Sequence, residues 1–186
     1  HYNWVEHAAD TADDGFMDRR DLLGYDQAFV DLVDRPNVFD LVADIMGANI
    51  ALSMTQAIVR PATNRFPGYT HTDGGEALRE IRVTESSRPL AMKAMYLLTD
   101  VTERNSGNLT VFPGSHLRPF PLPVSARGSA RAEVRAAEMP FQSSIDQRTP
   151  VLTPDSPGAH QLMGKDGDCY LFSHALWHGP ARNTTN

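Results

Sequence analysis

Cysteine is almost absent from this chain, in which Cys169 is the only one among 186 residues. A single cysteine cannot form a disulfide within the chain, and this fits a reducing compartment such as the cytoplasm. No apolar run approaches the roughly 20 residues that a membrane-spanning helix needs, and no signal peptide is recognisable at the start. We therefore expect a cytoplasmic protein without membrane segments, in which Cys169 is a small buried strand residue.

Basic residues are also scarce, with 17 Lys and Arg against 23 Asp and Glu and a formal net charge of −6. This balance argues against nucleic acid or an anionic membrane as the main partner. The hydrophobic share of 41% and the length suit a single soluble domain with its own core. Since the sequence begins at His1 rather than Met and stops abruptly at Asn186, we expect the protein to extend beyond both ends.

The first 47 residues have the pattern of a helical cover. Residues 26–34 place apolar side chains on one side of a predicted short helix. The apolar residues of 36–46 also recur at helical spacing. They lie between Pro36, which suits a first turn, and Gly47, which suits a helix end.

After residue 48 the pattern changes to short apolar or β-branched runs that end in turn residues. Five such runs are predicted strands: 49–59, 89–100, 108–112, 159–163 and 169–177. The first is expected to be a buried strand. Residues 117–158 form a long polar segment with one helix predicted near 130–137, and loops of this length often serve as lids or binding segments. Helices followed by strands predict an α+β or mostly β fold with a largely antiparallel core.

His71 and Asp73 are the first candidate site residues. One residue separates them, so in an extended backbone their side chains point to the same face. A strand end could therefore direct both at a single metal, with a third ligand from far away in the sequence. His178 is the best candidate for that ligand, but His174 shares its strand parity, and the residues alone leave the choice open. Two further candidates are His116 and His160.

Two histidines and one carboxylate on one face, with other metal positions open, form the ligand set of non-haem Fe(II) oxygenases. The same ligands together with a water can also hold a catalytic Zn²⁺. A histidine and an aspartate at this spacing also occur together by chance in loops. The spacing therefore indicates a metal site without fixing the metal.

Four sequence blocks, in a fixed order, carry a resemblance to a known family. They are residues 71–73, 96–101, 106–116 and 167–183. The third block, which reads Ser-Gly-Asn-Leu-Thr-Val-Phe-Pro-Gly-Ser-His, is the most specific. Over roughly residues 48–186 the chain resembles the phytanoyl-CoA dioxygenase (PhyH) family of Fe(II)- and 2-oxoglutarate-dependent oxygenases.

The resemblance implies a double-stranded β-helix, a cupin-like jelly roll with N-terminal helices packed outside. One oxygenase domain would span 1–186, with 1–47 as the helical cover, 48–186 as the core and 117–158 as a long insertion. The iron ligands, which form the catalytic centre, would be His71, Asp73 and His178. In the family, the distal ligand is the histidine that precedes Gly or Ser ahead of an Asn, and this selects His178.

The resemblance also implies 2-oxoglutarate as cosubstrate and dioxygen as oxidant. Arg60 matches a basic residue ahead of the His-x-Asp loop, and Tyr96 matches a strand position that often faces the cosubstrate. Lys93 has the opposite strand parity from Tyr96, so the two are not expected to face one pocket. The arginine that holds the far carboxylate of 2-oxoglutarate in the family would fall beyond Asn186. Pro180 stands where the family often has a hydroxyl.

Asp73 narrows the expected reaction. Halogenating relatives replace this carboxylate with a small residue, which frees a metal position for chloride. Asp73 therefore favours hydroxylation of an unactivated C–H bond, with 2-oxoglutarate converted to succinate and CO2. The expected substrate is a small-molecule metabolite or natural-product intermediate. Two alternatives are a non-catalytic jelly-roll binding module and a zinc enzyme with the same three ligands.

Overall fold

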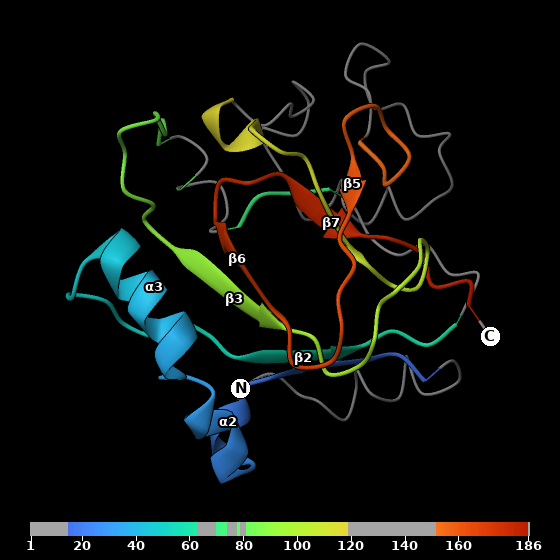
Figure 1. The fold of residues 1–186 in the computed structure, drawn as a ribbon, viewed down its shortest axis with the longest axis horizontal. Helices are drawn as coiled ribbons and strands as arrows, with labels where there is room; N and C mark the ends of the chain where they lie inside the picture. Colours follow the sequence, from blue (N-terminus) through green and yellow to red (C-terminus); the bar gives the residue numbers. More distant parts are fainter. Residues whose placement is uncertain (1–14, 63–69, 74–77, 79–80, 119–151, 186) are drawn as a thin grey trace, which may run out of the picture.

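Short strands in three antiparallel sheets surround the middle of the molecule (Figure 1). The computed structural model describes residues 15–62, 70–73, 78, 81–118 and 152–185. In these residues the strands are β1 (Met17–Arg20), β2 (Gln56–Val59), β3 (Met92–Tyr96), β4 (Leu109–Val111), β5 (His160–Gln161), β6 (Cys169–Ser173) and β7 (His178–Pro180). They pair as β1–β2, β3–β6 and β5–β4–β7. The described part is thus mostly β and antiparallel.

The described helices are short and lie mainly in the N-terminal part. They are η1 (Leu22–Gly24), α2 (Gln27–Asp31), α3 (Pro36–Met46) and η2 (Ser115–Leu117). The side chain of Asp26 accepts a hydrogen bond from the backbone N–H of Ala28 and so caps α2. Gly47 ends α3 at φ 94°, which favours glycine. The two helices predicted within the first 47 residues are confirmed. None of the described helices is long and apolar enough to cross a membrane.

The register of β3 against β6 decides which side chains face the interior. Lys93 lies opposite Phe172, and Tyr96 lies opposite Cys169. Because neighbouring residues of a strand point to opposite faces, the first pair shares one face and the second pair the other. Helix α3 lies outside this sheet and contacts β6 (Figure 1). Cys169 is half-buried on that outer face, so the prediction of a buried cysteine was wrong.

Two predicted segments near the N-terminus need correction. Residues 17–20, expected within the helical cover, form β1 and pair with β2. The strand predicted over 49–59 begins only at Gln56, and it is not buried, because Ile58 and Val59 are 45% and 48% exposed. Its β-branched composition favours a strand, but composition does not report whether another layer covers it. In the described structure, β1 and β2 form a ribbon of their own.

The strand predicted over 169–177 contains only β6 and the turn that follows it. β6 ends at Ser173, and the chain then turns, with the backbone N–H of Leu176 donating to the carbonyl of Ser173. β7 starts at His178 and pairs with β4. His178 therefore begins a new strand instead of ending the previous one. The apolar run concealed this turn, because its residues remain at least half-buried on both sides of it.

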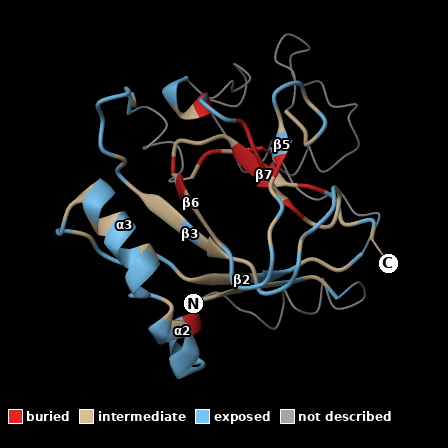
Figure 2. Cartoon of the chain, in the orientation of Figure 1, coloured by how far each residue is buried: buried red, intermediate tan, exposed pale blue. Residues whose placement is uncertain are grey.

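The remaining predicted strands lie where they were expected. β3, β4 and β5 fall inside the ranges predicted from the sequence, although each is shorter. The helix predicted near 130–137 lies outside the described residues. Figure 2 shows that the buried residues gather around β7 and its neighbours. That region is partly polar, since Asn108, Thr110 and His178 are 3% exposed or less.

Candidate metal centre

The backbones of His71 and His178 form an isolated antiparallel bridge. The N–H of His71 donates to the carbonyl of His178 over 2.7 Å, and the reverse bond measures 2.9 Å. Residues paired in this way lie directly opposite each other and place their side chains on one face. The ring centroids are accordingly 4.4 Å apart. The bridge brings together two imidazoles from distant parts of the sequence.

Asp73 completes the group from the same short segment as His71. Its backbone N–H donates to the carbonyl of His174 over 2.9 Å, which fixes the segment beyond the bridge. Its Oδ1 lies 3.8 Å from Nε2 of His71, and its Oδ2 lies 3.4 Å from Nε2 of His178. The predicted alternation of His71 and Asp73 therefore places both on one face.

Among the described residues, these three form the one group of potential metal ligands, with all ligand atoms within 4.8 Å of one another. Ligand atoms this close together could bind one shared metal ion. The structure thus brings together all three predicted ligands. The candidates His116 and His160 lie outside the group, on η2 and β5.

The environment of His178 keeps its imidazole neutral. Its Nδ1 lies 2.8 Å from the carbonyl oxygen of Leu176, so Nδ1 carries the proton and Nε2 carries the lone pair. Burial, together with the neighbouring His71, lowers the pKa of His178 to about 4. The ring of Phe172 packs edge-on against it, with centroids 4.9 Å apart. A neutral imidazole with a free Nε2 is the form that binds a metal.

The contacts of Asp73 Oδ2 test whether a cation fits this site. Oδ2 is buried and forms an ion pair with the ammonium of Lys93 at 2.9 Å, but it accepts no well-aligned hydrogen bond from a described residue. Nε2 of His178, which faces it at 3.4 Å, also presents a lone pair. Two acceptor atoms facing each other inside a protein are unfavourable unless a cation lies between them. The residues therefore fit a metal ion.

Lys93 is a site residue that the sequence reasoning did not assign. Its ammonium lies 2.9 Å from each oxygen of Asp73, donating a hydrogen bond to Oδ1 and forming an ion pair with Oδ2. It reaches the site from β3, on the face that it shares with Phe172. The parity argument showed that Lys93 and Tyr96 face opposite sides of β3. Only the pairing with β6 identifies Lys93 as the residue that faces the site.

His174 contributes through its backbone and not as a ligand. Its carbonyl accepts the hydrogen bond from Asp73, and its Nδ1 lies 3.1 Å from the carbonyl oxygen of Ala91. The side chain is almost fully buried, and no described residue pairs with its Nε2. Among the described residues it is His178, and not His174, that lies with His71 and Asp73, while the backbone of His174 holds the segment that carries Asp73.

The structure places Tyr96 and Arg60 away from the three ligands. The hydroxyl of Tyr96 donates to the carbonyl of Leu32, on the helix side of β3. The guanidinium of Arg60 lies over the ring of Phe16, 5.5 Å from its centroid. Burial lowers the pKa of Arg60, while the charge of Asp18 opposes that shift. Binding of 2-oxoglutarate by these two residues stays a prediction.

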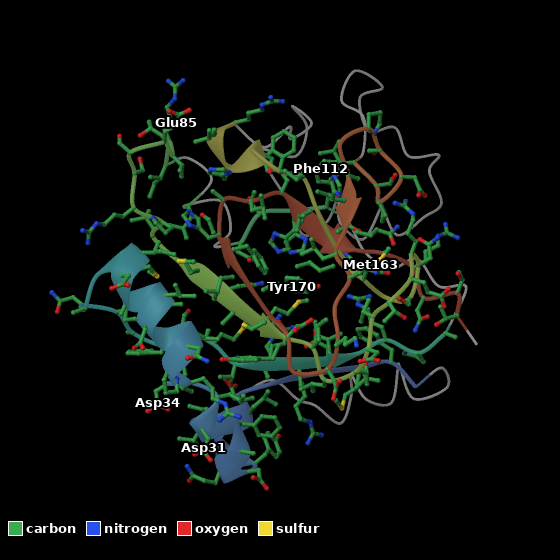
Figure 3. The ribbon with its side chains drawn as sticks, viewed as in Figure 1. Asp31, Asp34, Glu85, Phe112, Met163 and Tyr170 are labelled. Atoms are coloured by element: carbon green, nitrogen blue, oxygen red, sulfur yellow. The ribbon has the colours of Figure 1, made fainter. Side chains whose placement is uncertain are left out.

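Another inward residue on β6 is Tyr170, which has the same parity as Phe172. Figure 3 shows its side chain between β6 and the β5–β4–β7 sheet. Its hydroxyl oxygen is buried, and no described residue forms a hydrogen bond with it. Burial raises the pKa of Tyr170, and the charge of Asp168 adds to that shift. The interior face of β3–β6 therefore carries polar groups as well as the aromatic contact to His178.

Comparison with solved structures identifies proteins of the same fold. The apo structure of HygX from Streptomyces hygroscopicus aligns over 98% of this chain and 73% of HygX, with a TM-score of 0.63 and 21% identity. HygX with nickel, 2-oxoglutarate and hygromycin B bound aligns over 100% of this chain and 74% of HygX, with a TM-score of 0.60 and 20% identity. No match was found among curated protein sequences.

The fold and the site define a mostly β protein with a candidate centre of two histidines and one carboxylate. The sequence pattern of the phytanoyl-CoA dioxygenase (PhyH) family matches residues 5–186. The chain belongs to that family, which confirms the resemblance seen in the sequence. Family membership supports a 2-oxoglutarate-dependent oxygenase activity and a metal-binding role for the site.

Proposed function

We propose that this protein is an Fe(II)- and 2-oxoglutarate-dependent oxygenase that hydroxylates a small molecule. The observation that carries the proposal is the contact between Oδ2 of Asp73 and Nε2 of His178, two lone pairs 3.4 Å apart at a buried site. Together with His71 they supply three ligands on one face, which leaves the other positions of an octahedral metal open. Nickel and 2-oxoglutarate in the HygX structure support the same pairing of metal and cosubstrate here.

When bound, iron together with 2-oxoglutarate and dioxygen supplies the oxidising chemistry, while CO2 and succinate leave as products. The chain's own residues hold and shield that centre. His71 and His178 present imidazoles from opposed backbone positions, and Asp73 adds the negative charge. Phe172 covers one side of His178 and limits the access of water to it.

Hydroxylation is proposed over halogenation because Asp73 occupies the ligand position that a chloride ion would need. Its carboxylate lies against both histidines and is only 21% exposed. A chloride ion would therefore have to compete with a carboxylate that the backbone of His174 holds in position. The proposed substrate is a small molecule, which a screen of candidate compounds would identify.

Two architectural proposals accompany this function. The β3–β6 and β5–β4–β7 sheets would be the two faces of a double-stranded β-helix, with the site between them. Residues 1–186 would form one oxygenase domain, and the segment 117–158 would border the substrate entrance. The likeness of fold to HygX and the family match support both proposals.

The decisive experiment is anaerobic reconstitution with Fe(II), followed by oxygen, ascorbate and 2-oxoglutarate. We expect one iron per chain and succinate formation that increases with the correct substrate in a small-molecule screen. A zinc enzyme would retain zinc after metal-free purification and would ignore 2-oxoglutarate. A binding module would take up neither iron nor 2-oxoglutarate, and that result would overturn the proposal.

A further inference from the structure

The ion pair between Lys93 and Asp73 places an ammonium directly beside the candidate metal. The ammonium is 2.9 Å from both carboxylate oxygens, while the same carboxylate faces Nε2 of His178 at 3.4 Å. The ammonium of Lys93 and a bound metal would therefore compete for the carboxylate of Asp73. The Lys93 side chain is 37% exposed, so it can move without unfolding β3.

Formal charges show what this arrangement does. In the metal-free protein, the positive charge of Lys93 balances the negative charge of Asp73, so this pair carries no net charge. A divalent metal raises that total to two positive charges. A dianion bound to the metal returns it to zero. The local charge is thus balanced when neither the metal nor the dianion is bound, and again when both are bound. The unbalanced states are unfavourable, because charges interact strongly at these distances.

Coordination geometry places such an anion near Lys93. Three ligands on one face of an octahedron leave three open positions, and two of these are adjacent to any given ligand. A chelating anion that fills two open positions must therefore use at least one position adjacent to Asp73. Since the ammonium spans both oxygens of Asp73, it lies within reach of a group bound there.

We propose that Lys93 is an exchangeable counter-ion that weakens the binding of the metal alone and strengthens the binding of the dianionic cosubstrate afterwards. This rests on the proposed function, since it takes 2-oxoglutarate as the dianion. It assigns to β3 a charge that binds the cosubstrate. The consequence is an ordered assembly, in which metal and 2-oxoglutarate stabilise each other's binding.

The test uses Lys93→Met, which keeps most of the apolar stem and removes the charge, and Lys93→Arg, which keeps the charge. Lys165→Met removes an equal charge from the exposed turn before β6 and serves as the matched control. Calorimetry would measure first nickel binding and then 2-oxoglutarate binding to the nickel-loaded protein. Pyruvate, which shares the chelating group but is a monoanion, would be titrated in parallel. Circular dichroism would confirm that each variant is folded.

We expect Lys93→Met to bind nickel about tenfold more tightly and 2-oxoglutarate about tenfold more weakly, with a smaller loss for pyruvate. Lys93→Arg and Lys165→Met should resemble the wild type. Opposite shifts in one variant cannot come from general damage to the site. Weaker nickel binding by Lys93→Met would show instead that Lys93 positions Asp73, and unchanged 2-oxoglutarate binding would also overturn the proposal.

The same titrations separate this inference from the proposed function. If the wild type binds no nickel, or binds nickel but not 2-oxoglutarate, the proposed function itself is wrong. If the wild type binds both and Lys93→Met matches it in each titration, only the role of Lys93 is wrong. If the true partner of Lys93 is an anionic substrate, Lys93→Met should leave 2-oxoglutarate binding unchanged. The titrations would then rule out the proposed role of Lys93 but not the proposed function.

Discussion

His71 and His178 exchange two backbone hydrogen bonds, so the position of one imidazole is fixed by the strand that carries the other. β7 in turn pairs with β4, which gives the distal histidine a rigid support. Asp73 extends the same segment to the carbonyl of His174. Because backbone hydrogen bonds position these residues, replacing a side chain can change metal binding without unfolding the protein.

The two histidines of the 174–178 turn should differ in their roles. His178→Ala removes a lone pair that faces Asp73, so metal binding should fall by at least about 100-fold while the protein stays folded. His174→Ala removes the contact to Ala91 and leaves a buried cavity, which should lower the free energy of unfolding by about 2 kcal/mol. Isothermal titration with nickel and urea denaturation would measure the two quantities. If folded His174→Ala lost metal binding while His178→Ala kept it, His174 and not His178 would be the metal ligand.

Asp73→Ala should abolish 2-oxoglutarate-dependent hydroxylation. It removes the anionic ligand and leaves the charge of Lys93 beside the metal without its partner. The expected loss of substrate-coupled succinate formation exceeds about 100-fold, since even residues that only support metal ligands cost 10–100-fold. Asp40→Ala, at an exposed position of α3, is the matched control and should keep full activity. Full turnover by iron-loaded Asp73→Ala would refute the ligand assignment.

Asn108 should be essential for the stability of the β4 region. Its side-chain amide is almost fully buried, donating to the carbonyls of Glu103 and Leu162, while its oxygen accepts from the backbone of Ser106. Asn108→Asp replaces the two donors with a carboxylate oxygen that faces both carbonyls. Unfolding free energy should fall by about 3 kcal/mol in urea denaturation. The exposed Asn37→Asp should change it by less than about 0.5 kcal/mol, and an equal loss in both variants would contradict the argument.

Cys169 should be an unreactive thiol. Partial burial on the outer face of β6 raises the pKa of Cys169, so less thiolate is present at a given pH than for free cysteine. Reaction with a disulfide reagent at pH 8 should be slower than that of glutathione, and its pH midpoint should lie higher. The urea-unfolded protein provides the control, because its thiol should react at the rate of a free cysteine. Faster labelling of the folded protein would contradict the assigned environment.

The sequence predicted which three residues the structure brings together better than it predicted the framework around them. Local spacing explains why, because the relation of His71 to Asp73 depends only on the alternation of an extended backbone. Selection of His178 over His174 needed the family resemblance, since both fit the same parity. The structure then separates them by a turn between β6 and β7. Such a turn within an apolar run leaves no clear signal in composition.

Lys93 and Tyr96 show the complementary limit. Strand parity correctly placed the two on opposite faces of β3, but it could not determine which face points inward. The pairing with β6 decides this, because Phe172 opposite Lys93 contacts His178. Burial of β2 was overestimated for a related reason, since its composition does not reveal which layer covers it. Long-range pairing of strands supplies the information that local patterns lack.

The segment that carries His71 and Asp73 joins both sheets, through its bridge to β7 on one side and the ion pair to β3 on the other. It lies outside the strands of both sheets, so it should be a separate unit of local opening. The amide protons of His71, Asp73 and His178 should then exchange with solvent at one common rate. A metal bound to all three side chains would slow that rate together at each amide and leave the exchange of α3 unchanged. Hydrogen exchange at these positions would thus record occupancy of the site before any substrate is known.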